Sequence, residues 1–119
     1  MVNNINMSTK EELIKNIKSF FKSAELVYKT SDYTSSCILY FKVLFALFDY
    51  IILISGYEIP KDHTERFRTL ENYFPELYKN LDKLYPIYRN SYTTSISKID
   101  CDLVRNYVNR IIKEQKIQV

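Results

Sequence analysis

The sequence has little of what tight turns require. It contains one glycine, three prolines and no tryptophan among 119 residues. One glycine and three prolines leave little material for the hairpin turns between β-strands, so this composition argues against an all-β fold. With 46% apolar and 26% charged residues, the chain is typical of a globular protein, and its length suits one domain.

Cysteine and histidine are scarce as well. Cys37 and Cys101 lie far apart in the chain, and His63 is the one histidine that could join them as a ligand. These are too few ligands at the wrong spacing for a zinc site, so we expect neither a metal nor another cofactor. Two isolated cysteines without a signal peptide fit a reducing cytoplasm, which is the predicted location. The sequence is also compatible with a long-range disulfide between Cys37 and Cys101.

Charge of one sign and uninterrupted apolar runs are also limited. The formal net charge of +3 permits an anionic partner but is far from the dense basic patch of a dedicated nucleic-acid binder. The most apolar run, CILYFKVLFALFDYIILI, is interrupted by Lys42 and Asp49, each of which costs about 2.5–3.5 kcal/mol in mid-bilayer. We therefore expect this run to form a buried central helix and not a membrane span.

Apolar residues recur at helical spacing through the chain. Residues 1–8 are predicted to be a polar, flexible tail, followed by a first helix from about Lys10 to Lys29. Two residue pairs offer a capping box at its start: Ser8 with Glu11, and Thr9 with Glu12.

Polar residues and the single glycine predict where the later helices begin and end. The predicted caps are Ser31 or Asp32 for a helix ending near Ser55 before Gly56, Asp62 with Glu65 for a short helix, and Ser97 with Asp100 for the last helix. Pro75 suits the first turn of the remaining helix. Because short connections make sequential helices antiparallel, the predicted fold is all-α, an up-and-down four-helix bundle with an additional short helix, spanning residues 1–119 as a single domain.

The helical rows also predict which side chains face the core. In the short helix these are Phe67, Leu70, Tyr73 and Phe74. The next helix carries Leu77, Leu81, Leu84 and Tyr88 on one row and Tyr78, Tyr85 and Tyr92 on the adjacent row. In the last helix the inward residues are expected to be Leu103, Val104, Tyr107, Val108, Ile111 and Ile112.

Three polar features each have a functional and a structural interpretation. Lys42 and Asp49, seven residues apart, form either a polar seam facing a cleft or twofold partner, or two charges with separate partners. His63 is either a general base or a solvated residue in a first helical turn. The outward side of the last helix either contacts phosphates or faces solvent; it carries Arg105, Asn106, Asn109, Arg110 and Lys113. In each case the second interpretation is favoured.

The segment YPIYRNSY, from Tyr85 to Tyr92, is different. Pro86 falls inside a helix, where it removes a backbone donor and predicts a kink. Arg89 follows three residues later, and its fork of donors matches phosphate geometry, with Asn90 adding a short polar side chain. The alternative is a structural arginine that pairs with a carboxylate or stacks on a tyrosine.

Two stretches in order resemble the HEPN domain family (higher eukaryotes and prokaryotes nucleotide-binding). SDYTSSCILYFKVLFALFDYIILISGYEIPKDH is similar to that family's second helix, loop and third-helix entry. YRNSY is similar to its late arginine followed by a polar residue, here Arg89 and Asn90. The resemblance extends from about Lys10 to Lys113 and implies a HEPN-like helical domain.

In that family the arginine is often followed, after four to six residues, by a histidine, and the two form a metal-independent RNase site at a twofold dimer cleft. Here Thr94, Ser95 and Ile96 occupy those positions, and His63 precedes the arginine. Cleavage by the RNA 2′-hydroxyl needs a proton acceptor and a donor near neutral pH, and a tyrosine, with a reference pKa of about 10, is a poor base. Because the histidine of the motif is absent, we predict a member of the family without robust catalysis.

Three hypotheses follow. The leading one is a homodimeric module that binds nucleotide, RNA or a partner protein, in which Arg89 contacts an anionic group, Asn90 adds a hydrogen bond and Tyr92 lines the cleft. The second is a weak metal-independent RNase centred on Arg89. The third is a dimerising protein-interaction adaptor. The resemblance further implies a nucleotidyltransferase partner in a toxin–antitoxin-like pair, with Tyr92 as a candidate modification target.

Overall fold

Residues 2–119 form five helices. The computed structural model describes the backbone of residues 2–119 and the side chains from Thr9 onward. The helices are α1 (Val2–Tyr28), α2 (Tyr33–Ile54), α3 (His63–Tyr73), α4 (Pro75–Asn90) and α5 (Lys98–Glu114). No strand occurs between residues 2 and 119, so the predicted all-α class is confirmed.

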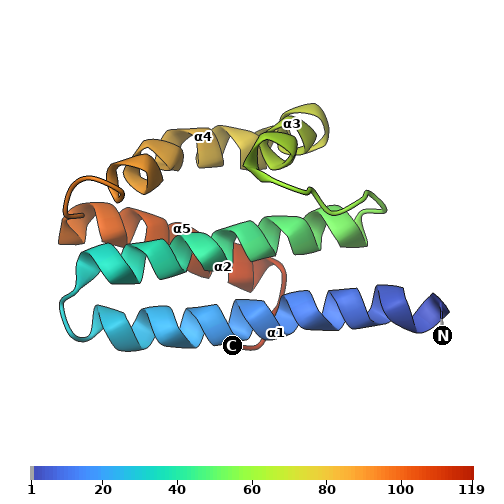
Figure 1. The fold of residues 1–119 in the computed structure, drawn as a ribbon, viewed down its shortest axis with the longest axis horizontal. Coiled ribbons are helices and arrows are strands. Elements are labelled where there is room, and N and C mark those ends of the chain that lie inside the picture. The colour runs from blue at the N-terminus through green and yellow to red at the C-terminus, as the bar shows by residue number, and fades with distance from the viewer. Residues whose placement is uncertain (1) are drawn as a thin grey trace.

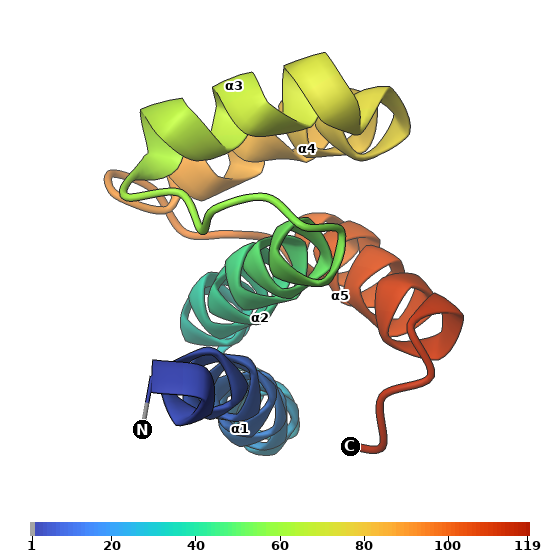
Figure 2. The same cartoon turned by 90° about the vertical axis from the view of Figure 1, so that its right-hand side faces the viewer.

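The helices lie in two layers around α2. α1 runs alongside α2 in the opposite direction and α5 packs against α2, whereas α3 and α4 lie above them (Figure 1). In the view turned by 90°, α1 and α2 are seen nearly end-on and α3 lies crosswise above α2 (Figure 2). We call α1, α2 and α5 the core layer and the other two helices the α3–α4 layer. The two layers meet where α4 contacts α2 and α5.

Local hydrogen bonds form the predicted caps. Three N-cap side chains accept from a backbone N–H three residues later: Asp32 from Ser35 at 3.1 Å, Asp62 from Glu65 at 2.8 Å, and Ser97 from Asp100 at 3.1 Å. Gly56 has a φ of 93° and follows the last turn of α2. There the Tyr57 N–H donates to the Ile52 carbonyl at 3.1 Å, which closes the helix end. These cap predictions are confirmed.

The predicted start of the first helix is wrong. α1 begins at Val2, and the backbone of Ser8 and Thr9 lies inside it, so the predicted capping boxes do not mark its start. The side chains of residues 1–8 lie outside the described residues, and the flexible tail predicted there stays a prediction.

α2 is the buried central helix that its apolar run predicted. Phe41, Leu44, Leu47 and Phe48 are fully buried in the core. By length and composition alone α2 could cross a membrane, with a mean hydropathy of 2.2 over its most apolar window, but 61% of that window is buried inside the protein. The helix is packed as the core helix of a globular protein is.

Two predicted core positions are exposed. Leu103 on α5 is 52% exposed and Tyr73 at the end of α3 is 54% exposed. Helical spacing gives the side of a helix that carries apolar residues, but Leu103 lies outside the buried stripe of α5. The buried residues of that helix are Cys101, Val104, Tyr107, Val108, Ile111 and Ile112. The apolar face of α5 is therefore wider than the part of it that is buried.

Arg105 does not face solvent as predicted, because it joins α5 to α1 and α2. Its Nε and Nη2 donate to the two carboxylate oxygens of Glu25 at 2.9 and 3.0 Å. Nε also lies 3.0 Å from the Tyr40 hydroxyl, which donates to the same carboxylate. The Arg105 hydrogen bond holds the pKa of Glu25 below its usual value, against the opposing effect of burial.

Candidate functional site

Arg89 and Asn90 lie in the last turn of α4, which continues through Pro86 and ends at Asn90. Both side chains are exposed. Among residues 9–119, neither side chain makes a hydrogen bond or an ion pair. Arg89 therefore has no structural partner in the described part of the chain, and its guanidinium is free for a ligand.

Tyr92 follows α4 and is 72% exposed, so its predicted place on an inward row is wrong. Its hydroxyl donates to the Tyr88 hydroxyl at 3.0 Å, and the two rings lie 5.5 Å apart. Burial and this hydrogen bond raise the pKa of Tyr88 to about 12. Tyr88 also packs against Phe41 and Phe45 of α2, so it connects the exposed end of α4 to the core.

Asp49 and Arg66 form an ion pair between the two layers. Nε and Nη2 of Arg66 donate to the two carboxylate oxygens of Asp49 at 2.8 and 2.9 Å, and each side chain is 11% exposed. Lys42 is exposed, with its Nζ 6.0 Å from the ring centre of Phe20. Lys42 and Asp49 thus have separate surroundings, and the polar seam considered from their spacing does not form.

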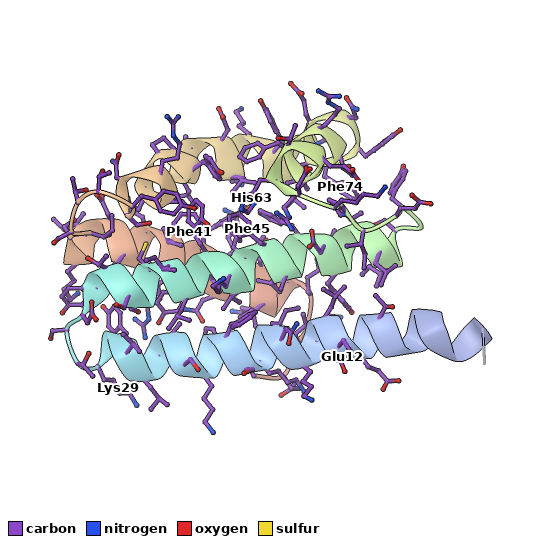
Figure 3. All side chains as sticks on the ribbon, viewed as in Figure 1. Glu12, Lys29, Phe41, Phe45, His63 and Phe74 are labelled. Carbon is purple, nitrogen blue, oxygen red and sulfur yellow. The ribbon has the colours of Figure 1, made fainter. Side chains whose placement is uncertain are left out.

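His63 is not the solvated surface residue predicted from its position. Its ring lies 4.5 Å from that of Phe45 and 5.8 Å from that of Tyr88, between α2 and the α3–α4 layer (Figure 3). Its Nδ1 is 2.7 Å from Nη1 of Arg66. A guanidinium can only donate, so Nδ1 accepts and the proton of the neutral ring is on Nε2.

The surroundings of His63 disfavour its protonation. Burial and the adjacent Arg66 charge lower its pKa, although Asp49 and Asp62 act in the opposite direction. A proton on Nδ1 would also displace the hydrogen bond from Arg66. His63 is therefore a hydrogen-bond donor through Nε2, and no lone pair remains with which it could act as a base.

A groove of about 440 Å³ lies between α3 and α4 beside this histidine. Its lining includes His63, Phe67, Arg68, Glu71, Tyr78 and Tyr85. The Phe67 ring meets the rings of Tyr78 and Tyr85 edge-on, with centres 6.2 and 4.7 Å apart. The groove thus has aromatic walls and carries a donor, a cation and a carboxylate.

Arg68 and Glu71 in the groove are exposed and uncommitted. Neither takes part in an ion pair or a side-chain hydrogen bond within residues 9–119. Glu71 does act on the groove electrostatically, because its charge raises the pKa of Tyr78. An unpaired guanidinium and an unpaired carboxylate beside aromatic rings can recognise a planar ligand that has both acceptors and donors.

The other candidate sites are weaker. A hollow of about 670 Å³ lies at the far end of α2, where Leu53 and Ile54 line it together with Lys10 and Glu58. Cys37 and Cys101 are both buried and free, so the disulfide left open by the sequence is not formed. Among residues 9–119, no three His, Cys, Asp or Glu side chains are placed to hold a metal ion.

Sequence reasoning missed the roles of Arg66, Arg68 and Glu71. The spacing of His63 and Arg66, three residues apart near the start of a helix, predicts that the two side chains are neighbours. Nothing in the local pattern relates Arg66 to Asp49 on another helix. Arg68 and Glu71 also lie three residues apart, but they border a groove only because α4 folds back along α3.

The fold and site define an all-α protein whose candidate binding groove lies between α3 and α4. Comparisons with protein-family models, with curated proteins and with solved structures gave no match. The function of this chain is therefore inferred from the geometry of its own residues.

Proposed function

We propose that this chain is a cytoplasmic, HEPN-like four-helix-bundle module that binds a nucleotide or the nucleotides of an RNA without cleaving them. Arg89 contacts a phosphate, Asn90 adds a hydrogen bond and Tyr92 provides an aromatic face at the end of α4. The observation that carries the proposal is the exposed Arg89 guanidinium, which has no carboxylate partner among the described residues. The exposed Tyr92 follows it three residues later.

The contrast with the three paired arginines supports this assignment. Arg66 and Arg105 are each held by two hydrogen bonds to a carboxylate on another helix, and Arg110 pairs with Glu114 on its own helix. A guanidinium already paired in this way has few donors left for a phosphate. Arg89 has its whole fork available for bidentate contact.

The state of His63 supports binding over cleavage. The fold brings this ring to 5.8 Å from the ring of Tyr88, the residue before Arg89, although its place in the sequence does not match the RNase motif. Its Nδ1 is occupied by Arg66, and its pKa is lowered. General acid–base catalysis needs a group that exchanges protons near neutral pH, which this arrangement opposes.

The test is a titration of the protein with 5′-mononucleotides and with a short single-stranded RNA. We expect Arg89→Ala to weaken binding by about tenfold to hundredfold, the value of a lost charge-assisted hydrogen bond. Arg110→Ala is the matched control and should leave the affinity unchanged. The absence of binding, or binding that does not respond to Arg89, would contradict the proposal.

The RNase alternative has its own assay. Incubation of the protein with RNA in the presence of a chelator should leave the RNA intact. Metal-free cleavage that disappears in both Arg89→Ala and His63→Ala would instead show that the protein is an RNase.

A second candidate function is dimerisation, which two exposed apolar residues favour. Ile99 is 76% exposed and Leu103 is 52% exposed, and they lie one turn apart on α5. A twofold contact between two copies would bury them. Sedimentation velocity should detect a dimer that is weakened by Leu103→Lys and much less by the control Asn106→Lys. A wild-type protein that stays monomeric at all concentrations would rule this candidate out. The nucleotidyltransferase partner stays a prediction from the resemblance.

A further inference from the structure

We infer that the groove between α3 and α4 is a base-binding subsite that selects guanine, so that the ligand is a guanine nucleotide. The inference rests on the proposed function, because it assigns the phosphate of the same nucleotide to Arg89. It concerns different residues, those of the groove, and makes a separate claim about which base is bound.

The walls of the groove suit a flat ring. Phe67, Tyr78 and Tyr85 border a space of about 440 Å³, large enough for a purine, at the surface between two helices. Stacking on aromatic side chains is the usual way in which proteins hold unpaired bases, and it does not depend on which base is present. The walls therefore explain the binding of a base, and the polar groups must supply the choice among bases.

The polar groups match the edges of guanine. Arg68 offers a fork of donors, and guanine presents the acceptors O6 and N7 side by side, the pair that arginine contacts most often. Glu71 offers acceptors, and guanine has donors at N1 and at its amino group. Adenine presents a donor where guanine has O6, so it would place an amino group opposite Arg68.

His63 adds a donor of fixed direction. Because Arg66 occupies Nδ1 at 2.7 Å, the proton on Nε2 cannot move to the other nitrogen. Nε2 makes no hydrogen bond to the described residues, and His63 is only partly buried and lines the groove, so Nε2 is available to a ligand there. It can donate to an acceptor on the base or on the sugar.

The groove and Arg89 lie within reach of one nucleotide. Tyr85 lines the groove, and Arg89 is four residues further along α4, about 6 Å along the axis and on the same face. A ribose separates the base from the 5′-phosphate by a similar distance. Tyr92, three residues beyond Arg89, then remains available to a neighbouring base of an RNA.

The experiment is calorimetric titration with GMP, AMP and guanosine. We expect GMP to bind at least about tenfold more tightly than AMP, as a site that pairs with base edges requires. Glu71→Gln and Arg68→Met should each weaken the binding of GMP more than that of AMP, and so remove this preference. Both side chains are exposed, so the variants should fold, and Glu76→Gln and Arg110→Met are the matched controls.

The outcomes separate this inference from the proposed function. Equal binding of GMP and AMP that depends on Arg89 would overturn the guanine subsite and leave the proposed function standing. A preference for GMP that survives both Glu71→Gln and Arg68→Met would also overturn the subsite. GMP binding that needs Glu71 but not Arg89, and that is no tighter than guanosine binding, would support the subsite and overturn the phosphate contact. No binding of any nucleotide would overturn both.

Discussion

The core layer and the α3–α4 layer are held by different kinds of interaction. α2 and α5 contribute most of the buried apolar side chains, whereas the buried residues of α3 and α4 in the described structure are Arg66, Leu70 and Leu81. The core layer is therefore stabilised mainly by removal of apolar surface from water. The α3–α4 layer combines a smaller apolar contribution with one ion pair and with aromatic contacts. A layer that buries little apolar surface can present polar side chains to a ligand. The candidate site lies in this layer for that reason.

The largest expected effect comes from breaking the ion pair between the layers. Asp49→Asn leaves the Arg66 charge buried without a counter-charge, and we expect a loss of about 3–5 kcal/mol in the free energy of unfolding. Chemical denaturation measures the loss. In Glu114→Gln, which removes an exposed pair with Arg110, the loss should be below about 0.5 kcal/mol.

The same variant can show where the loss acts. Hydrogen exchange in Asp49→Asn should accelerate most in α3 and α4, because these helices lose their main polar attachment. Uniform acceleration in all five helices, or a loss similar to that of the Glu114 control, would mean that the pair does not join the layers as described.

A smaller effect is expected inside the core layer. Glu25→Gln weakens the contact with Arg105, and we expect a loss of about 1–2 kcal/mol because the pair is partly exposed. The folded state holds the pKa of Glu25 below 4.5, so its contribution is present above that pH and is lost as the pH falls further. The acid limb of a plot of stability against pH should therefore be shallower in Glu25→Gln. An unchanged limb would contradict this account.

The junction between the layers offers a third test. Gly56 has a positive φ and nothing within 4 Å of an added Cβ, so Gly56→Ala should cost about 1 kcal/mol through backbone conformation alone. Lys116 adopts a similar φ of 56° after α5. Lys116→Gly is the opposite substitution at a similar φ, so it should raise the free energy of unfolding.

The smallest effect is the pH dependence of the α3–α4 layer. The folded state lowers the pKa of His63 below 6.5, so the unfolded chain binds more protons and stability falls as the pH drops through 6.5. Hydrogen exchange of α3 amides on either side of that pH measures the change. His63 is the single histidine in the chain, so His63→Gln should remove this dependence. A dependence that persists in the variant would assign it to another group.

Local signals predicted much of the fold. Each cap at Asp32, Asp62 and Ser97 depends on a hydrogen bond to a residue three positions away, and such bonds are encoded in adjacent residues. The site was predicted less well. Arg89 and Asn90 were proposed from their side-chain chemistry, but the groove between α3 and α4 is formed by two helices whose relative placement the sequence pattern does not specify.

The sequence by itself determined that the chain is helical, where most helices begin and end, and that α2 is buried. Short-range hydrogen bonds and apolar periodicity are sufficient for these properties. Only the tertiary structure decided which charged side chains form ion pairs between helices. Arg66 meets Asp49 across 17 residues and Arg105 meets Glu25 across 80, so those arginines are occupied while Arg68 and Arg89 remain available. Such pairings depend on how whole helices pack, because a charge selects its partner by distance in space.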